Sequence, residues 1–304
     1  MSTLQEARAF AAAGFDDITW AFTLIVHRLP EARELAERVR FAVTVDSREA
    51  VEALERSPGR FPVFLKIDCG YHRAGVDPQG ELAVELASRL AAAPRLELAG
   101  ILTHAGHAYG RRGRAALLEV ADEERRVMVR CAERLREAGL VIPTVSVGST
   151  PTMSVVEDLT GVDEMRPGNY AFYDLSQVVF GSCAATDCAL TVIASVVSSQ
   201  PGAAHSIVDA GALALSKDPG PTELGHASMG AILSDYATGG ISQAHRLTGL
   251  SQEHGHLSGR LPVGDRVRIL PNHSCLTAAQ FDEYVVVDGE RVVDRWPVLR
   301  GRDG

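Results

Sequence analysis

Lysine is almost missing from this 304-residue chain. Lys66 and Lys217 are the only two, so arginine supplies most of the 30 basic side chains, which face 39 acidic ones and leave a formal net charge of −9. No basic tract interrupts this acidic balance, which argues against nucleic acid as a partner. Two lysines also leave few amines for covalent catalysis.

Cysteines and long apolar runs are scarce as well. The five cysteines are odd in number and scattered, which favours reduced thiols over a disulfide framework and predicts a cytoplasmic setting. No stretch of about 18 uninterrupted apolar residues offers a membrane span, and the N-terminal region lacks the pattern of a signal peptide. We therefore expect a soluble protein without a membrane partner, whose 46% apolar content can form a large core.

The first two-thirds of the chain alternates short apolar runs with longer amphipathic stretches. This rhythm predicts parallel strands joined by helices. Several of the strands end in polar or glycine-rich turns, which is where a (β/α)8 barrel carries its functional groups. The expected strands cover residues 18–23, 41–45, 63–67, 98–103 and 145–147, and the expected helices cover 48–56, 80–93 and 115–138.

The pattern changes near residue 189, where β-rich segments separated by Gly, Pro and Ser replace the helical periodicity. We expect strands over residues 190–198, 205–209, 265–270, 283–287 and 291–296. The fold class predicted from the sequence is α/β, with a barrel domain over residues 1–188 and a mainly antiparallel β domain over residues 189–304.

Two turns at consecutive strand ends have the composition of a phosphate-binding loop. Gly148-Ser149-Thr150-Pro151-Thr152 offers backbone N–H groups and hydroxyls, and Arg166-Pro167-Gly168-Asn169-Tyr170 forms the second turn. A single loop of this kind is more often a plain strand-to-helix turn. Arg73, between two glycines, can direct its guanidinium at an anionic oxygen, although a surface arginine on a turn is the simpler interpretation.

His273 and Cys275 form the one candidate metal pair. Residues two apart in an extended segment face the same side, so imidazole and thiolate can bind one Zn²⁺ together. The simpler alternative is a half-buried histidine beside an inert cysteine. His245, His254 and His256 are surrounded by Gly, Ser, Gln and Glu, and we interpret them as a mobile loop rather than a metal cluster.

Together these segments resemble the fold-type III pyridoxal-phosphate enzymes, specifically the D-serine dehydratase and D-threonine aldolase group of the alanine racemase-like barrels. The matching stretches occur in the family's order and span nearly the whole chain. They are residues 65–76, 100–107, 145–152, 167–170, 209–212 and 271–275. The resemblance implies a homodimer and a small-molecule D-β-hydroxy amino acid as substrate.

The resemblance also implies roles for individual residues around pyridoxal 5'-phosphate. Arg73 would contact the cofactor's 3-oxygen, and Arg166 would face the ring nitrogen as in alanine racemases. His273 and Cys275 would bind a divalent metal beside the substrate's β-hydroxyl, where it assists loss of hydroxide or retro-aldol cleavage. The other residues expected to bind the cofactor are Tyr71, His104, Gly148, Ser149, Thr150, Gly168 and Asn169.

The cysteine in the metal pair favours one reaction. Dehydratases of this group are similar in pairing His with Cys and aldolases in pairing His with Asp, so Cys275 favours dehydration of D-serine to pyruvate and ammonia, with zinc as the metal. D-Threonine aldolase activity, which yields glycine and acetaldehyde, stays open, as do D-threo-3-hydroxyaspartate as substrate and a non-catalytic remnant. A racemase is disfavoured because it needs no metal pair.

The family's Schiff-base lysine has no match in this sequence. It is expected in a Pro-His-x-Lys-Thr-His-like strand ahead of the region around residues 4–8, whereas Lys66 lies inside a later strand and Lys217 lies in the β domain. Without it the cofactor has no covalent anchor and the Cα proton no obvious base, so no catalytic residue is assigned. We expect residues 1–304 to form an incomplete barrel, through truncation or a misassigned start, that is inactive or poorly folded by itself.

Overall fold

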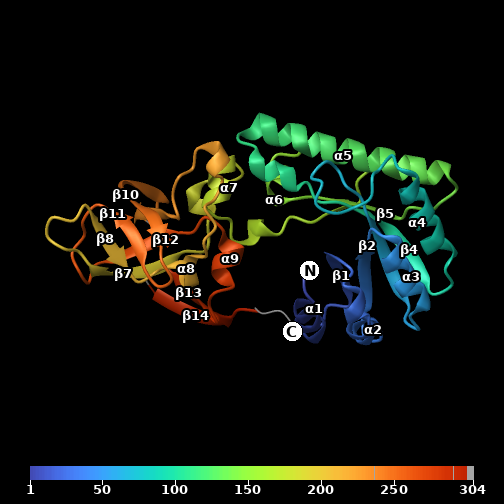
Figure 1. Ribbon diagram of the computed structural model, residues 1–304, viewed down its shortest axis with the longest axis horizontal. Coiled ribbons are helices and arrows are strands. Elements are labelled where there is room, and N and C mark those ends of the chain that lie inside the picture. The colour runs from blue at the N-terminus through green and yellow to red at the C-terminus, as the bar shows by residue number, and fades with distance from the viewer. Residues whose placement is uncertain (236, 290, 300–304) are drawn as a thin grey trace. The chain divides into compact units, whose positions relative to one another are not determined.

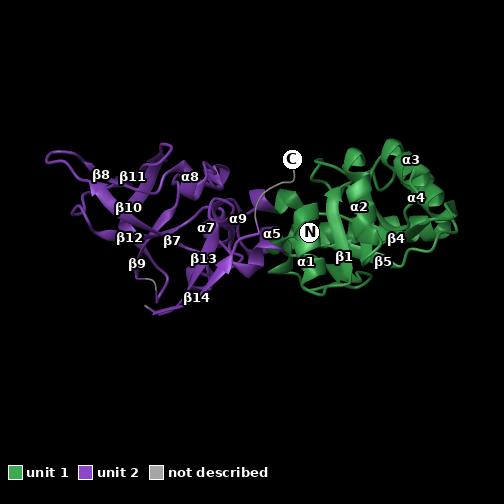
Figure 2. Ribbon diagram, turned by 90° about the horizontal axis from the view of Figure 1, so that it is seen from below, with its two compact units in different colours: residues 1–108, 118–167, 301–304 green, residues 109–117, 168–300 purple. Residues whose placement is uncertain are grey.

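The computed structural model describes residues 1–235, 237–289 and 291–299, and its elements are labelled in Figure 1. The chain divides into two compact units, coloured separately in Figure 2. Among the described residues, unit 1 contains 1–108 and 118–167, and unit 2 contains 109–117 and 168–299. The division follows Pro167, while the boundary near residue 188, drawn from the change in residue pattern, stays a prediction.

Unit 1 is built on a parallel sheet of six strands that follow one another in sequence order. The five strands expected in this region are confirmed, and the sheet is open rather than closed among the described residues, as an incomplete barrel requires. The strands are β1 (Asp17–Thr23), β2 (Arg40–Val45), β3 (Phe61–Lys66), β4 (Leu96–Leu102), β5 (Thr144–Val147) and β6 (Glu164–Met165). The unpredicted β6 is too short to give a periodic signal.

Helices connect these strands, and some of them begin at side-chain caps. Thr3 and Glu6 form a capping box at the start of α1, and Ser47 caps α3. Buried leucines such as Leu54, Leu86 and Leu135 pack with the strands into the main core of unit 1. The helices are α1 (Leu4–Ala12), α2 (Leu29–Ala36), α3 (Arg48–Arg56), α4 (Glu81–Ala92), the long α5 (Arg114–Glu137; Figure 1) and the short α6 (Thr150–Met153), with 3-10 turns η1 (Val26–Arg28) and η2 (Gly106–Gly110).

Unit 2 contains a closed antiparallel barrel in the order β10-β11-β8-β7-β12-β9. Its core is made of alternate apolar residues, among them Val208, Leu247, Leu257 and Ile269. The strands are β7 (Val192–Ser198), β8 (His205–Val208), β9 (Ala231–Asp235), β10 (Gly240–Leu250), β11 (Gly255–Ser258) and β12 (Arg266–Leu270), followed by the separate hairpin of β13 (Glu283–Asp288) and β14 (Arg291–Pro297). The mainly antiparallel β fold expected for this region is confirmed.

Short helical segments precede and interrupt the barrel. They are α7 (Leu175–Phe180), α8 (Ala212–Leu215) and α9 (Ser274–Ala278), with 3-10 turns η3 (Asn169–Ala171), η4 (Ala185–Asp187) and η5 (Thr222–Leu224). Leu175 and Cys188 pack with Leu233 and Leu270 of the barrel, which draws the segment after Pro167 into unit 2. No helix of the described residues has the length and apolar character needed to cross a membrane.

One expectation for unit 2 is wrong. His245 and His256 lie in strands β10 and β11 and not in a loop, while His254 does lie in the turn between these strands. His245 Nδ1 is 2.8 Å from the carbonyl oxygen of Ser258, and His256 pairs across the ladder with Ile207. Strands β10 and β11 were missed because each contains one fully buried leucine, Leu247 in β10 and Leu257 in β11. Such a strand shows no alternating apolar pattern.

The contact between α1 and α2 gives a test of the fold. Glu31 receives hydrogen bonds from Arg28 (Nε to Oε1, 2.7 Å) and from Arg8, and these hold its pKa at about 2, below the ordinary 4.5. Because the folded-state pKa is lowered, this stabilisation is present above pH 4.5 and is lost as the pH falls through 2. We expect Glu31→Gln to lower the urea unfolding midpoint at pH 7, with a difference from wild type that shrinks below pH 4.5. A pH-independent difference would contradict this assignment.

Candidate active site

The turn that follows β3 places Arg73 and Tyr71. Asp68 Oδ1 accepts hydrogen bonds from the backbone N–H groups of Gly70 (2.9 Å) and His72 (3.0 Å), which folds the turn on itself. Gly75 has φ +117°, and a Cβ there would meet the Asp68 nitrogen at 2.6 Å, so this position requires glycine. The Arg73 guanidinium lies 4.9 Å from the centroid of the Tyr71 ring, a cation–π contact at the carboxyl end of the strand.

His104 follows β4 and approaches the same ring. The two rings meet edge to face with centroids 6.4 Å apart, and Tyr71 lies so close to Gly106 that a Cβ on that glycine would be 2.2 Å from the ring. His104 Nδ1 lies 3.3 Å from the carbonyl oxygen of Gly148, which assigns the proton to Nδ1 in the neutral ring. Burial, before any other cause, lowers the pKa of His104 to about 4. The imidazole is therefore neutral at pH 7.

Arg166 crosses the ends of β4 and β5. Its Nε donates to Ser146 Oγ at 2.6 Å, and its Nη2 donates to the carbonyl oxygen of Thr103. Burial lowers the pKa of Arg166, and burial together with the neighbouring Arg73 and Arg166 charges lowers the pKa of Lys66. Cations and aromatic rings thus gather at one end of the sheet, an arrangement that fits an anionic aromatic ligand.

Glu124 of α5 is a residue of this region that the sequence analysis missed. Its carboxyl group is fully buried and accepts hydrogen bonds from Ala105 N (3.1 Å), Gly148 N (3.0 Å) and Thr152 Oγ1 (3.2 Å). Burial raises its pKa against the opposing effect of these donors. A signal was present, because Glu124 falls at helical spacing in the stripe of buried residues that includes Val120 and Met128.

The hydrogen bonds of Glu124 limit which groups of the loop after β5 can bind a phosphate. The Gly148 N–H is used by Glu124, and the Ser149 N–H donates to Thr152 Oγ1 at 3.1 Å within the loop's own capping box. Ser149 Oγ lies 3.0 Å from the same hydroxyl. A phosphate beside Gly148, Ser149 and Thr150 would therefore meet hydroxyl groups rather than the first two N–H groups of the loop.

In unit 2, His273 and Cys275 meet at the start of α9. The expected extended geometry holds for His273, which is in the N-cap position with extended backbone, but is wrong for Cys275, which already belongs to the first turn of the helix. The two side chains nevertheless lie close enough to shift each other's pKa, and His273 Nδ1 lies 3.0 Å from Asp218 Oδ2. Asp218 first and Cys275 second raise the pKa of His273 to about 10, and His273 lowers the pKa of the Cys275 thiol.

This donor set fits one divalent cation. A carboxylate behind a histidine fixes its tautomer and orientation, as outer-shell groups do in metal sites, and a thiol with a lowered pKa readily becomes a thiolate ligand. Asp218 had no local sequence signal, since its partner is 55 residues away. No cluster of three or more His, Cys, Asp or Glu ligands occurs in the part of the chain that the structure describes, so His273 and Cys275 would be two protein ligands of a partly open site.

Asn169 belongs to the same group in unit 2. Its Nδ2 donates to Asp174 Oδ2 (2.8 Å) and to Ser274 Oγ (3.0 Å), and it lies 3.7 Å from Cys275 Sγ. Gly168, the residue before it, precedes η3 and is exposed. The expected site residues thus form one group in each unit, with Tyr71, Arg73, His104, Gly148, Ser149, Thr150 and Arg166 in unit 1 and Gly168, Asn169, His273 and Cys275 in unit 2.

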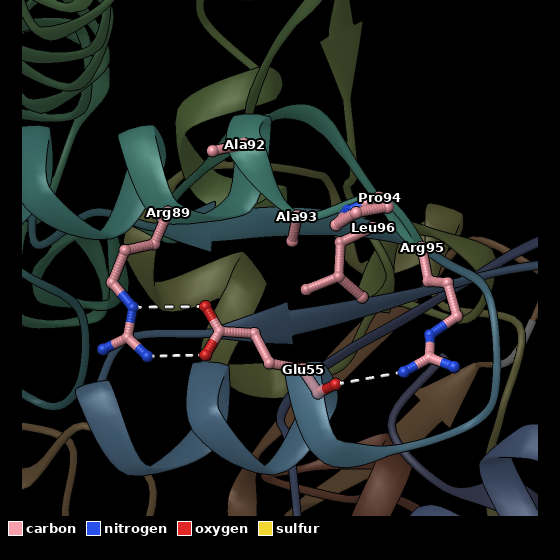
Figure 3. Close-up of a pocket in the computed structure, with 7 residues that line it drawn as sticks. All are labelled: Glu55, Arg89, Ala92, Ala93, Pro94, Arg95 and Leu96. Carbon is pink, nitrogen blue, oxygen red and sulfur yellow. Dashed lines mark hydrogen bonds and ion pairs between the residues drawn. The ribbon is translucent and has the colours of Figure 1, made fainter.

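A pocket of about 510 Å³ lies at the opposite end of the unit 1 sheet, where β4 begins (Figure 3). Its wall is stabilised by Arg89, which bonds Glu55 Oε2 at 2.6 Å, and by Arg95, whose Nη2 lies 3.5 Å from the Glu55 carbonyl oxygen. The residues that line it are Glu55, Arg89, Ala92, Ala93, Pro94, Arg95 and Leu96. None of them belongs to the candidate site.

Comparison with known proteins agrees with the fold. Residues 1–176 match the family model of the alanine racemase N-terminal domain, and residues 189–287 match a putative serine dehydratase domain. D-Threo-3-hydroxyaspartate dehydratase of Delftia sp. (strain HT23) is 39% identical over 99% of this chain and 83% of its own length, and its solved structure superposes with a TM-score of 0.93. Solved variants of that enzyme include a His→Ala exchange and, two positions further on, a Cys→Ala exchange in a metal-free form.

Two further relatives widen the comparison. D-Serine dehydratase of Dictyostelium discoideum is 33% identical over 96% of this chain and 80% of its own length. The structure of D-threonine aldolase from Filomicrobium marinum is 28% identical, with a TM-score of 0.83 over 98% of this chain and 80% of that one. Fold and site together define an alanine racemase-like protein. The chain belongs to the D-serine dehydratase and D-threonine aldolase group of that family, whose members are pyridoxal-phosphate-dependent D-amino acid lyases.

The buried neutral His104 gives a pH test of this region. Its folded-state pKa of about 4 lies below the 6.5 of an exposed histidine, so between these values the unfolded chain binds a proton that the folded chain does not. Stability should therefore fall as the pH drops from 6.5 to 4. We expect His104→Asn, whose amide can still donate to Gly148, to lose less unfolding free energy over this window in urea titrations. Parallel losses in both proteins would contradict a buried neutral imidazole.

Proposed function

We propose that this protein is a dehydratase of D-β-hydroxy amino acids that uses pyridoxal 5'-phosphate and zinc. The observation that carries the proposal is the His273–Cys275 pair, with Asp218 behind the imidazole at 3.0 Å. The four relatives named as dehydratases are 39%, 33%, 30% and 27% identical, and the two named as aldolases are 26% and 28% identical, so the most similar of these relatives favour dehydration. D-Serine and D-threo-3-hydroxyaspartate are the proposed substrates, and the proposed assembly is a homodimer.

The metal would be held by His273 Nε2 and Cys275 Sγ. Asp218 keeps the proton on Nδ1, so Nε2 presents its lone pair to the cation. Thiolate and imidazole together suit zinc better than magnesium or calcium, which prefer oxygen ligands. The His-x-Cys spacing equals that of the two positions exchanged in the Delftia enzyme, and the Cys→Ala variant was solved in a metal-free form. When bound, the metal polarises the substrate's β-hydroxyl and stabilises the departing hydroxide.

The cofactor would lie against the cationic end of the unit 1 sheet. Pyridoxal 5'-phosphate supplies electron withdrawal from Cα when it is bound. Arg73 would contact its 3-oxygen, with Tyr71 and His104 against the ring. Arg166 would face the ring nitrogen, and because a guanidinium has donors but no acceptor, it cannot receive a hydrogen bond from a protonated pyridine. The phosphate would be contacted by Gly148, Ser149 and Thr150 of unit 1, whereas Gly168 and Asn169, also expected to bind it, belong to unit 2.

A pyridoxal-phosphate lyase needs a lysine to anchor the cofactor, and the chain has two lysines. Lys66 is buried within β3 beside the Arg73 and Arg166 charges, and Lys217 is exposed in unit 2. Neither matches the family's Schiff-base lysine, so we assign no covalent or proton-transfer step to them. The second candidate is a protein that binds the cofactor and metal without turnover.

A product assay separates the candidates. In an expressed protein that also carries the Schiff-base lysine expected ahead of residues 4–8, with pyridoxal 5'-phosphate and zinc, we expect D-serine to yield pyruvate and ammonia. D-Threo-3-hydroxyaspartate should yield oxaloacetate and ammonia, because the metal promotes loss of the β-hydroxyl. A chelator should abolish both reactions and zinc should restore them. Glycine and an aldehyde from D-threonine, without a keto acid from D-serine, would identify an aldolase. Cofactor binding without any product would identify the non-catalytic candidate.

Metal titration tests the ligands directly. Cys275→Ala and His273→Ala should each weaken zinc binding by more than about 100-fold, since loss of an outer-shell partner alone costs about 10–100-fold. Cys275→Asp should shift preference from zinc toward manganese, because oxygen ligands suit the harder cation. Cys183→Ala, in the same unit, is the matched control and should bind zinc as the wild type does. Equal zinc affinity in Cys275→Ala and wild type would contradict the site.

A further inference from the structure

A buried carboxylate lies directly behind the His273–Cys275 turn, and the proposed chemistry does not use it. Asp174 is 2% exposed. Its Oδ1 caps α7 by accepting from Gln177 N at 3.0 Å. Its Oδ2 accepts from Ser274 N (3.0 Å) and Ser274 Oγ (3.4 Å), and Ser274 is the residue between the two metal ligands. Capping α7 uses only Oδ1, so the hydrogen bonds from Ser274 to Oδ2 are not needed for the cap.

The carboxylate also fixes the orientation of the Asn169 side chain. A carboxylate only accepts hydrogen bonds, so the group 2.8 Å from Asp174 must be the amide nitrogen of Asn169 and not its oxygen. The same nitrogen faces Ser274 Oγ at 3.0 Å and Cys275 Sγ at 3.7 Å. Asn169 therefore presents N–H donors to an anion on one side and to the metal-ligand sulfur on the other.

This orientation leaves Asn169 Oδ1 on the opposite side of the amide. That oxygen is buried and has no hydrogen-bond partner among the described residues. Buried polar atoms in native structures are nearly always satisfied, so an orphan acceptor indicates a donor that belongs to a ligand. The Asn169 amide contacts Cys275 Sγ. If Cys275 binds a metal, the donors close to Asn169 Oδ1 would be a metal-bound water and the substrate's β-hydroxyl.

We propose that Asp174 and Asn169 are positioning residues of the metal site. Asp174 holds the Ser274 backbone so that His273 and Cys275 converge. Asn169, oriented by Asp174, donates to the Cys275 thiolate and offers Oδ1 to a water or hydroxyl bound at the metal. The inference rests on the proposed function, because it requires His273 and Cys275 to bind a metal. It assigns a role at the metal site to Asp174 and Asn169, neither of which is proposed to bind the metal itself.

Zinc affinity of the full chain, measured by competition with a chromophoric chelator, tests this inference. Asn169→Leu keeps the side-chain volume but removes the donors and the acceptor, and Asp174→Asn removes the charge. Each should weaken zinc binding about 10–100-fold, the range for outer-shell partners. Asp235→Asn is the control, since Asp235 closes an exposed turn by accepting from Ala237 N (2.9 Å) and Thr238 Oγ1 (2.8 Å) in the same unit.

A second readout separates positioning from loss of structure. Cobalt(II) bound to Cys275 gives a thiolate charge-transfer band, which should shift in Asn169→Leu because the sulfur loses its N–H donor, while the metal-free unfolding midpoint stays near that of the wild type. Asp174 caps α7, so Asp174→Asn can also disturb the fold, whereas Asn169 caps no α-helix. Asn169→Leu is therefore the variant that separates a positioning role from loss of structure. A folded Asn169→Leu protein with wild-type zinc affinity and an unshifted band would overturn the proposal.

Failure of this inference is distinguishable from failure of the proposed function. If Cys275→Ala weakens zinc binding and Asn169→Leu does not, the metal site stands and the positioning role is wrong. If Cys275→Ala binds zinc as tightly as the wild type, the metal site itself is wrong and the positioning role falls with it.

Discussion

Both groups of site residues depend on a buried carboxyl group that gathers hydrogen-bond donors from separate loops. In unit 1, Glu124 binds the backbone N–H groups that follow β4 and β5, and so sets the loops that carry His104 and Ser149. In unit 2, Asp174 binds Asn169 and the Ser274 backbone. Removing such an acceptor leaves buried donors unsatisfied, at a cost of about 1–3 kcal/mol for each donor. The loops therefore have one low-energy arrangement.

The two groups have opposite electrostatic character. Arg73, Arg166 and Lys66 make the carboxyl end of the parallel sheet cationic, which suits a phosphate-bearing aromatic cofactor. Around His273, by contrast, a carboxylate and a thiol with a lowered pKa supply negative charge, which suits a divalent cation. These opposite charges match the two groups named in the proposed function, an anionic cofactor for unit 1 and a divalent cation for unit 2.

The sequence predicted what local patterns encode and missed what only the fold brings together. Apolar runs bounded by turns located β1 to β5, whereas β6 was too short to detect. Glu124 carried a detectable signal at its helical spacing. Asp174 carried none, because Ser274 is 100 residues away along the chain. The His273–Cys275 pair was found although the geometry expected for it was wrong, since the cysteine lies in a helical turn and the side chains still meet.

The central claim is that a thiolate and an imidazole of unit 2 hold the metal. X-ray absorption at the zinc edge of the full chain tests it most directly. We expect one sulfur at about 2.3 Å and imidazole nitrogen at about 2.0–2.1 Å, with oxygen ligands completing the shell. Loss of the sulfur shell in Cys275→Ser would complete the assignment. A wild-type spectrum with oxygen and nitrogen ligands alone would contradict the account.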